Sequence, residues 1–345
     1  MKSSSWIKLL SFTITLAAGA AIFVWFLDRY DTEDTFAILN DFGLFAFFGF
    51  VAISLANFSL LGWRWQMAVN EHALERKLSF WTVVRHRMSG YAVSYLTPSA
   101  QVGGEPLRIA LLHKDGVPIA HATSSVILDV VFEIAGFIIY IALGLFISLF
   151  QHVLPTRVEW GVGAALAVIA CAIVLFFLSI TSSRGFFSTG MRLLLPRRFA
   201  LARKLEPKLL RVESLMRETL RRNPHLILWM LGISIITVAF RGVEVAYLAY
   251  FLGHPVGVVE AILLSSIPGL ALLVPIPSAL GVLEGSTAGI VALLGLALNP
   301  IALVLLIRFR DVIFIILGVA HIGHSLQTWL QKKIVEPVSI AVHRL

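Results

Sequence analysis

The chain has 345 residues, of which 58% are hydrophobic and only 14% are charged, and its mean hydropathy is +0.87. Soluble domains are about half apolar and about one quarter charged, so this composition excludes an ordinary water-soluble protein. The net charge of +8 is concentrated in a few connections, which indicates membrane topology and argues against nucleic-acid binding. A single cysteine, Cys171, excludes an intrachain disulfide.

The first apolar run extends over residues 9–27 and follows two lysines. Its small residues Ala18 and Ala20 would also suit the cleavage site of a signal peptide. The run is nevertheless longer than a signal core of about 7–15 residues, so we expect a retained first span.

Further full spans are predicted at residues 36–62, 119–150, 159–181, 225–252 and 299–329, since about 20 apolar residues cross a bilayer core. Two other apolar stretches, residues 80–117 and 258–297, are interrupted near the middle by Pro, Gly and Ser, and their pieces are short for a span. The sequence therefore predicts an all-α polytopic membrane protein. We expect one transmembrane domain, residues 1–345, with about six full transmembrane helices and two broken or re-entrant helical hairpins.

The distribution of charge predicts the orientation, because positively charged loops stay in the cytoplasm. The connection after the first span is acidic, whereas the next one contains Arg64, Arg76, Lys77, Arg85 and Arg87. Lys332 and Lys333 follow the last span. We expect a multi-pass protein of the cell (cytoplasmic) membrane with both termini in the cytoplasm.

Residues 182–224 form a basic loop, in which the segment 184–222 has eleven Lys and Arg against three Glu, a net charge of +8. Apolar residues recur at helical spacing within it: Leu201, Leu205, Leu209, Val212, Met216 and Leu220. This pattern predicts a cytoplasmic amphipathic helix on an anionic lipid leaflet. The alternative is recruitment of a soluble enzyme or of nucleic acid, and nucleic acid would require a base-contacting motif that the loop lacks.

An internal repeat relates the two halves of the chain. The segment from Pro98 to Glu105 matches the segment from Pro277 to Glu284 at an offset of 179, in Pro, Ser, Ala and Glu. A second match follows farther along the two halves and relates Asp129 to Asp311 at an offset of 182. The matched residues are few in a chain rich in Val, Ile and Ala, so chance similarity is the alternative to duplication. We predict a first repeat at residues 36–150 and a second at 225–330.

The predicted topology makes the second repeat inverted, because its hairpin enters from the opposite side of the membrane. Inverted repeats with broken helices are a recurrent transporter design, since they provide two near-equivalent states that open to opposite sides.

The segment PSAQVGGEPLR, from Pro98 to Arg108, and the later segment PIPSALGVLEG resemble the paired signatures of the lysylphosphatidylglycerol synthase transmembrane region, a flippase-like domain family. The resemblance covers roughly residues 10–330. It implies a membrane domain that translocates a lipid. We expect this chain to lack the soluble aminoacyltransferase domain of two-domain members, so lipid aminoacylation is not implied.

Charged residues within spans are costly and indicate a polar path. The candidate substrate-binding residues are Glu105, Arg108, Asp129, Glu133, Glu284, Arg308, Arg310 and Asp311. We expect the repeat to bring the Asp129 and Arg308 clusters together, where they alternately pair with one another and with a headgroup. The alternative is a static network of buried ion pairs. Breaks in the hairpins are assigned to Pro98, Gly103, Gly104, Pro277 and Gly281.

Two further pairs share a helix face. Arg241 and Glu244 are spaced to neutralise each other, and His321 and His324 are too few for a metal site. No nucleotide-binding or catalytic motif is present, so we expect neither a catalytic site nor a cofactor.

The sequence thus favours a non-enzymatic lipid translocator for a polar or phosphate-bearing headgroup, with membrane lipids as its partners. One alternative is a membrane enzyme that acts on lipid-linked substrates through Asp129, Glu133 and Asp311. Another is a non-catalytic partner of a lipid synthase or glycosyltransferase. The oligomeric state is left open.

Overall fold

The computed structural model describes residues 32–71, 77–98, 102–151, 155–181, 200–270 and 274–330, and the single residues 21, 24, 25 and 188. All regular structure in these residues is helical. The predicted first span and most of the basic loop before residue 200 lie outside the described residues, as do the two lysines that follow the last helix.

The first half contains α2 (Thr32–Glu71), α3 (Phe80–Leu96), α4 (Glu105–Lys114) and α5 (Ile119–Gln151), followed by α6 (Thr156–Thr181) and α8 (Ala200–Arg222). The second half contains α9 (His225–Phe251), α10 (Val258–Leu270), η2 (Pro277–Ala279), α11 (Val282–Leu293) and α12 (Pro300–Leu330). A long helix, a helical hairpin and a long helix therefore follow one another twice. Both predicted hairpins are broken near the predicted positions.

Within the part of the chain that the structure describes, three helices are long and apolar enough to cross a membrane: Thr35–Glu71, Ile119–Gln151 and His225–Phe251. The segments Val258–Leu270 and Pro277–Leu293 are shorter apolar helices. These findings confirm an α-helical membrane protein. The total of about six spans stays a prediction.

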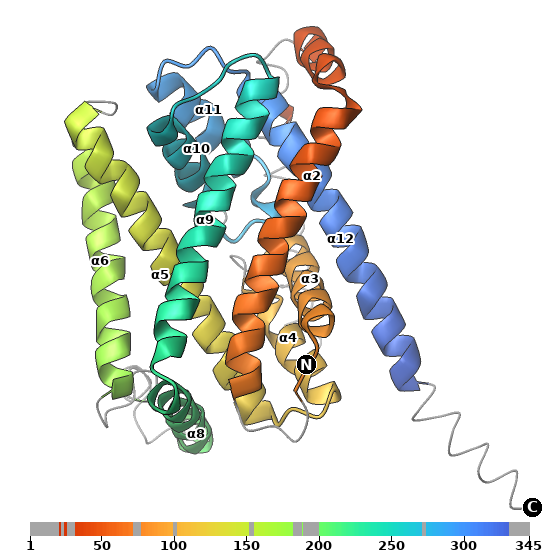
Figure 1. Ribbon diagram of the computed structural model, residues 1–345, viewed down its shortest axis with the longest axis vertical. Helices are drawn as coiled ribbons and strands as arrows, with labels where there is room; N and C mark the ends of the chain where they lie inside the picture. The colour runs from red at the N-terminus through yellow and green to blue at the C-terminus, as the bar shows by residue number, and fades with distance from the viewer. Residues whose placement is uncertain are drawn as a thin grey trace, which may run out of the picture.

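Figure 1 shows that corresponding helices of the two halves run in opposite directions. Helix α2 descends in this view while α9 rises, and α5 rises while α12 descends. The hairpin of α3 and α4 occupies the lower half of the molecule, and the hairpin of α10 and α11 occupies the upper half. The two hairpins therefore extend toward each other from opposite ends.

The broken ends of the hairpins touch. The hydroxyl of Ser278, in η2, donates a hydrogen bond of 3.2 Å to the carbonyl oxygen of Tyr95, near the end of α3. Ser278 and Ala279 have φ angles of +56° and +46°, which L-residues adopt at a cost of about 1–2 kcal/mol each. The second break is therefore held in a strained backbone conformation against the first hairpin.

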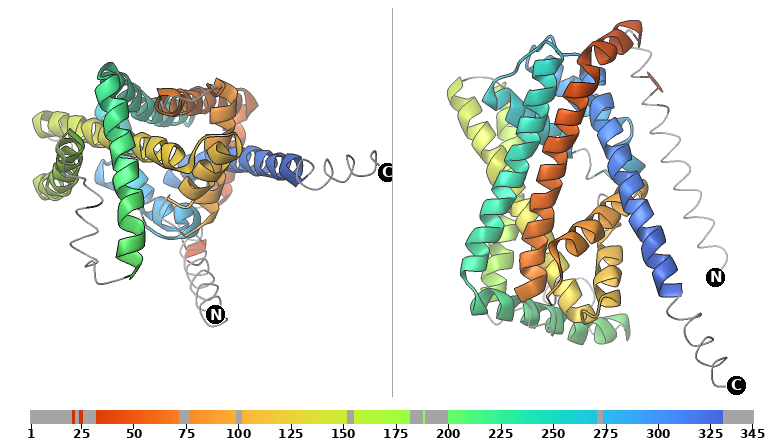
Figure 2. Two further views of the ribbon diagram at one scale, coloured as in Figure 1. Left: turned by 90° about the horizontal axis from the view of Figure 1, so that it is seen from below. Right: turned by 45° about the vertical axis from the view of Figure 1, so that its right-hand side comes forward.

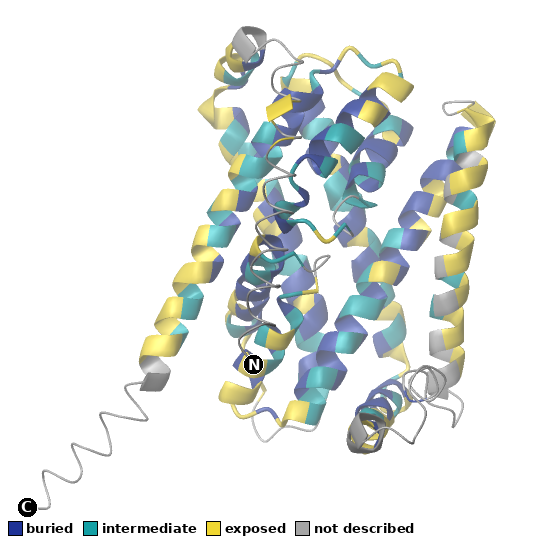
Figure 3. Ribbon diagram, turned by 180° about the vertical axis from the view of Figure 1, so that it is seen from behind, coloured by how far each residue is buried: buried dark blue, intermediate teal, exposed yellow. Residues whose placement is uncertain are grey.

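Helix α8 lies across the lower end of the bundle, as the view from below shows (Figure 2). Its apolar residues Val212, Met216 and Leu220 are buried against residues of α2, α5 and α9, and the burial colours of Figure 3 show this covered side. The second half of the stripe that the sequence predicted to face lipid is thus covered by the protein itself, whereas Leu205 is 36% exposed. The basic residues Lys208, Arg211, Arg221 and Arg222 are exposed.

Long helices cross closely at glycines. A Cβ atom on Gly136 of α5 would lie 2.7 Å from the carbonyl carbon of Ser234 in α9, and one on Gly318 of α12 would lie 2.5 Å from the carbonyl oxygen of Met88 in α3. Small residues at such crossings let membrane helices pack by van der Waals contact where no hydrophobic effect drives association. These crossings bring the charged side chains of different helices within reach of one another.

Candidate functional site

The first cluster is built around Asp129, which is fully buried in α5. Its Oδ1 accepts a hydrogen bond of 2.8 Å from Arg64 Nε, and its Oδ2 accepts one of 2.5 Å from Arg108 Nη2 and another from Arg87 Nη1. Three helices therefore each direct one arginine at a single carboxylate. Burial makes such charges costly unless they are paired and hydrogen-bonded.

Two of these arginines were assigned to another role by the sequence. Arg64 and Arg87 were counted among the charges of a basic connection, but Arg64 lies within α2 with 0% exposure and Arg87 lies within α3 with 8%. The prediction of a loop position for them was wrong. Both precede or follow apolar residues within a helix, and this flanking pattern is the signal that could have placed them inside the bundle.

Glu133 lies one helical turn beyond Asp129 and completes the cluster. Its Oε2 accepts hydrogen bonds from Arg64 Nη2 at 2.9 Å and from Arg87 Nη2 at 2.5 Å, and its Oε1 lies 3.4 Å from Arg241 Nη2. The side chains of Glu133 and Arg241 are 27% and 36% exposed, so this edge of the cluster is open.

The charges of the first cluster do not cancel. Its four arginines are Arg64, Arg87, Arg108 and Arg241, and its three carboxylates are Glu105, Asp129 and Glu133, which leaves one positive charge in excess. The Nε atom of Arg108 is buried and has no hydrogen-bond partner among the described residues. Its guanidinium carbon lies 3.9 Å from the centre of the Trp65 ring, which offers cation–π stabilisation. The arrangement is suited to an additional anion.

The second cluster begins at the strained break of the second hairpin. Glu284 Oε2 accepts a hydrogen bond of 2.7 Å from the backbone N–H of Gly281, and its Oε1 accepts bonds of 2.9 and 2.6 Å from Arg308. Arg308 Nη1 also donates to the Ser278 carbonyl oxygen at 2.8 Å and to the Tyr95 hydroxyl at 2.9 Å. Arg308 thereby connects α12, both hairpins and the cap of α11.

Asp311 forms the other part of the second cluster. Its two oxygens accept hydrogen bonds of 2.7 Å from the hydroxyls of Tyr91 and Tyr95, and Oδ1 also accepts one of 2.8 Å from Arg310 Nη2. Arg310 Nη1 donates to Glu244 at 2.7 Å. Two arginines and three carboxylates leave this cluster with one negative charge in excess. The tyrosines were not singled out by the sequence, because their spacing alone matches an ordinary helix face.

The two clusters are neighbouring layers that share helices. Helix α3 contributes Arg87 to the first and Tyr91 to the second, one helical turn apart. Among the described residues, no ion pair joins Asp129 or Glu133 to Arg308 or Arg310, so the predicted pairing between clusters is absent and each cluster is paired internally.

The mutual neutralisation that the spacing of Arg241 and Glu244 allows is not found among the described ion pairs. Arg241 faces Glu133 in the first cluster, while Glu244 pairs with Arg310 in the second. Helix α9 therefore contributes one charge to each layer. Each of the two side chains points toward a partner on a facing helix and not toward its neighbour on α9.

The residues assigned to the breaks act in different ways. Gly281 caps α11 at φ +80°, where glycine alone is unstrained. Gly104 has an ordinary φ of −83°, and its requirement is space: a Cβ atom there would lie 1.8 Å from the carbonyl oxygen of Gly90. Pro277 is buried at the start of η2, whereas Pro98 follows the end of α3 and Gly103 lies in the turn before α4.

A third polar group lies toward the end of the bundle where α8 is found. His86 of α3 is buried, with Nδ1 3.1 Å from His321 Nε2 and Nε2 2.7 Å from Asp115 Oδ2. Burial by itself raises the pKa of Asp115, but the hydrogen bond and the charge of His86 outweigh it, so that the pKa lies below its ordinary value. The sequence suggested His324 as the companion of His321, and the structure supplies His86 and Asp115 instead.

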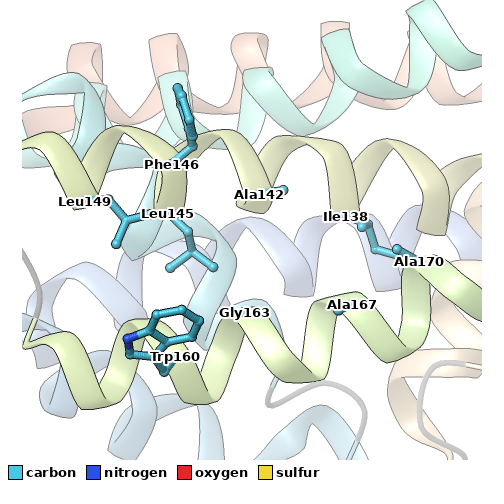
Figure 4. Close-up of a pocket in the computed structure, with 9 residues that line it drawn as sticks. All are labelled: Ile138, Ala142, Leu145, Phe146, Leu149, Trp160, Gly163, Ala167 and Ala170. Atoms are coloured by element: carbon cyan, nitrogen blue, oxygen red, sulfur yellow. The ribbon is translucent and has the colours of Figure 1, made fainter.

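An apolar cavity of about 410 Å³ lies between α5 and α6 (Figure 4). Its lining includes Leu145 and Leu149 of α5 and Trp160, Gly163 and Ala167 of α6. It has no charged lining residue and is separate from the clusters. Within the described part of the chain, no group of three His, Cys, Asp or Glu is arranged to hold a metal ion.

The buried charge layers and the apolar helices together define a polytopic α-helical membrane protein. The family model described as lysylphosphatidylglycerol synthase TM region matches residues 9–318, and the chain belongs to this family. The resemblance noted in the sequence is confirmed over most of the chain. No curated protein sequence matches the chain.

Proposed function

We propose that this protein translocates lipids, passing a polar or phosphate-bearing headgroup between the two leaflets of the membrane. The observation that carries the proposal is the meeting of two broken hairpins, which enter from opposite ends, at the second of two neighbouring layers of charged residues. The family supports a role connected with membrane lipids.

The arrangement of the halves supports an inverted repeat. Helix α3 of the first hairpin packs against α12 of the second half, and helix α10 of the second hairpin packs against α5 of the first half. Each hairpin thus packs against the last long helix of the other half. Helices α2 and α9 lie side by side and run in opposite directions. A pseudo-two-fold arrangement of this kind has two states of similar energy, one open to each side. The headgroup path would then open alternately above and below the contact between Ser278 and Tyr95.

The charge layers provide partners for a headgroup during passage. The first layer has one positive charge in excess, an open edge at Arg241 and an unpartnered Nε on Arg108. A phosphate would supply the missing anion, and arginine can hold two of its oxygens at once. The second layer has one negative charge in excess, which suits a basic group on the same lipid. The clusters are therefore better matched to a polar cargo than to an apolar one.

The same contacts favour transport over catalysis. A general acid or base needs a carboxyl group that exchanges its proton near the working pH. Asp129 accepts hydrogen bonds from three arginines, and Glu133 pairs with three. Arginines so close favour the charged carboxylate. Carboxylates held in this way are better suited to positioning a cargo than to proton transfer.

The membrane setting follows from the same proposal. We place the protein in the cytoplasmic membrane with both termini and α8 in the cytoplasm. The exposed basic residues of α8 would contact anionic headgroups, while its buried stripe holds it to the bundle.

Lipid exchange in reconstituted vesicles tests the proposal. The purified protein is incorporated into vesicles with a fluorescent phospholipid in both leaflets, and outer-leaflet fluorescence is removed with impermeant dithionite. The wild type is expected to expose inner-leaflet lipid to the reagent. A charge-assisted hydrogen bond contributes about 1.5–3 kcal/mol, so Arg308→Ala should slow exchange by roughly tenfold or more.

Matched variants separate this effect from general loss of charge. Arg157→Ala removes an exposed arginine at the start of α6 and should exchange lipid as the wild type does. Arg308→Lys keeps the positive charge but loses the planar set of N–H donors, so its exchange rate should lie between those of the wild type and Arg308→Ala. A folded Arg308→Ala protein that exchanges lipid at the normal rate would support the alternative of a static network of ion pairs. Formation of a chemically altered lipid would support the alternative of a membrane enzyme.

A further inference from the structure

The histidine group joins two elements that must separate if the hairpins move. His86 lies on the first hairpin and His321 on α12, and their facing nitrogens are 3.1 Å apart. Nearby, the hydroxyl of Ser89 donates to the Gly318 carbonyl oxygen at 3.2 Å, and Lys114 Nζ donates to the Ser325 hydroxyl at 3.2 Å. Polar bonds therefore join both helices of the first hairpin to α12 at this end, beside the close packing of Gly318 against Met88.

The distances between His86, Asp115 and His321 indicate which ring nitrogens carry protons while the three side chains are in contact. The 2.7 Å contact of His86 Nε2 with Asp115 places a proton on Nε2. The Nδ1 atom of His86 is then an acceptor, and His321 must donate from its Nε2. With one added proton, His86 is a cation that donates to both neighbours, and His321 becomes the acceptor by holding its proton on Nδ1. The contact persists in both states because one proton always lies between the rings.

A second added proton breaks this arrangement. Both rings then carry protons on the facing nitrogens, so that two N–H groups and two positive charges oppose each other across 3.1 Å. The surroundings do not compensate. Among the described residues, the charged and titratable groups that face the pair are Arg85 on α3, Lys114 and Asp115 at the end of α4, and His324 on α12. A single carboxylate is thus opposed by two permanent cations.

We propose that His86, Asp115 and His321 form a proton-binding site that locks the first hairpin to α12 and releases it when both histidines are charged. The ligand is the proton, and the site couples its uptake to opening of the end at which α8 lies. The inference rests on the proposed movement of the hairpins. It adds an ion that can drive or regulate this movement, and it uses residues outside both charge clusters.

Spin-label distances test the lock without requiring lipid transfer. In a background with Cys171→Ser, labels are placed at the exposed residues Ala110 of α4 and Gln327 of α12. The second proton has to bind beside an existing positive charge, so the pH series extends well below the ordinary imidazole pKa of about 6.5. Between about pH 8 and about pH 3, the wild type should gain a population with a longer distance. A distance distribution that is constant over this range overturns the proposal.

Substitutions identify the titrating group. His321→Gln places an amide where Nε2 stood, so it keeps a hydrogen bond to His86 without titrating and should abolish the pH response. His324→Gln, at an exposed position on the same helix, should leave the response intact. A response of wild-type size in His321→Gln contradicts the proposal.

Removal of the carboxylate provides an independent measurement. Asp115→Asn withdraws the one anion of the group, so that protons bind less readily and the midpoint of the transition should move to lower pH by about one unit or more. An unchanged midpoint contradicts the proposal. Since none of these readings depends on transport, they distinguish failure of the lock from failure of the proposed lipid exchange.

Discussion

Asp129→Asn isolates the central contact of the first charge layer. The substitution keeps the shape of the side chain but removes the charge that Arg64, Arg87 and Arg108 share, all at buried positions. The excess of the layer rises from one positive charge to two, and the new amide group directs N–H donors at a guanidinium donor. Breaking a buried ion pair costs about 3–5 kcal/mol, which lowers the ratio of folded to unfolded protein roughly a hundred- to several-thousand-fold.

The free energy of unfolding can be measured in mixed micelles by titration with sodium dodecyl sulfate, followed by tryptophan fluorescence. Asp41→Asn, at an exposed position in α2, is the matched control and should change stability by no more than about 0.5 kcal/mol. The reasoning is refuted if Asp129→Asn lies within about 1 kcal/mol of the wild type.

A double substitution tests whether charge is the cause. Adding Arg87→Gln to Asp129→Asn restores the excess of one positive charge in the layer. The two changes together should therefore cost less than the sum of the single changes, with an interaction energy of about 1–3 kcal/mol. Simple additivity would show that lost packing, and not uncompensated charge, destabilises Asp129→Asn.

Two further predictions concern packing and use the same unfolding assay. Gly104→Ala would place a Cβ atom 1.8 Å from a facing carbonyl oxygen and should destabilise by about 1–3 kcal/mol, whereas Gly161→Ala, with nothing within 4 Å, should be neutral or slightly stabilising. Equal effects would contradict the close crossing. Met216→Ala, at a fully buried position of α8, should cost about 2–5 kcal/mol, and Leu205→Ala, at a 36% exposed position, under about 1 kcal/mol. If α8 instead buried its stripe in lipid, Met216→Ala would cost no more than Leu205→Ala.

Much of the fold could be predicted because it follows from local composition. The predicted spans 119–150, 225–252 and 299–329 differ by at most one residue at either end from α5, α9 and α12. Both hairpins were located by Pro, Gly and Ser, which interrupt helices for reasons local to the backbone. The family followed from the short motifs around the same breaks.

The partners within the site could be predicted only in part. Asp129, Glu133, Arg308, Arg310 and Asp311 were recognised as charges within the spans, because a charge within an apolar helix is conspicuous. Their pairing was not recognised, since it depends on how helices far apart in sequence rotate against one another.

The sequence by itself determined that this protein is an α-helical membrane protein of its family, where most of its described long helices lie and where two hairpins break. Apolar length, charge and helix-breaking residues act within a few turns, so a linear pattern is sufficient to detect them. Only the tertiary structure decided that Arg64 and Arg87 belong to the interior, that the clusters are paired internally, and that His86 meets His321. Ion pairs and hydrogen bonds act over a few ångströms in space, and helix packing sets those distances. The spacing of residues along the chain does not reveal which distant helices pack together.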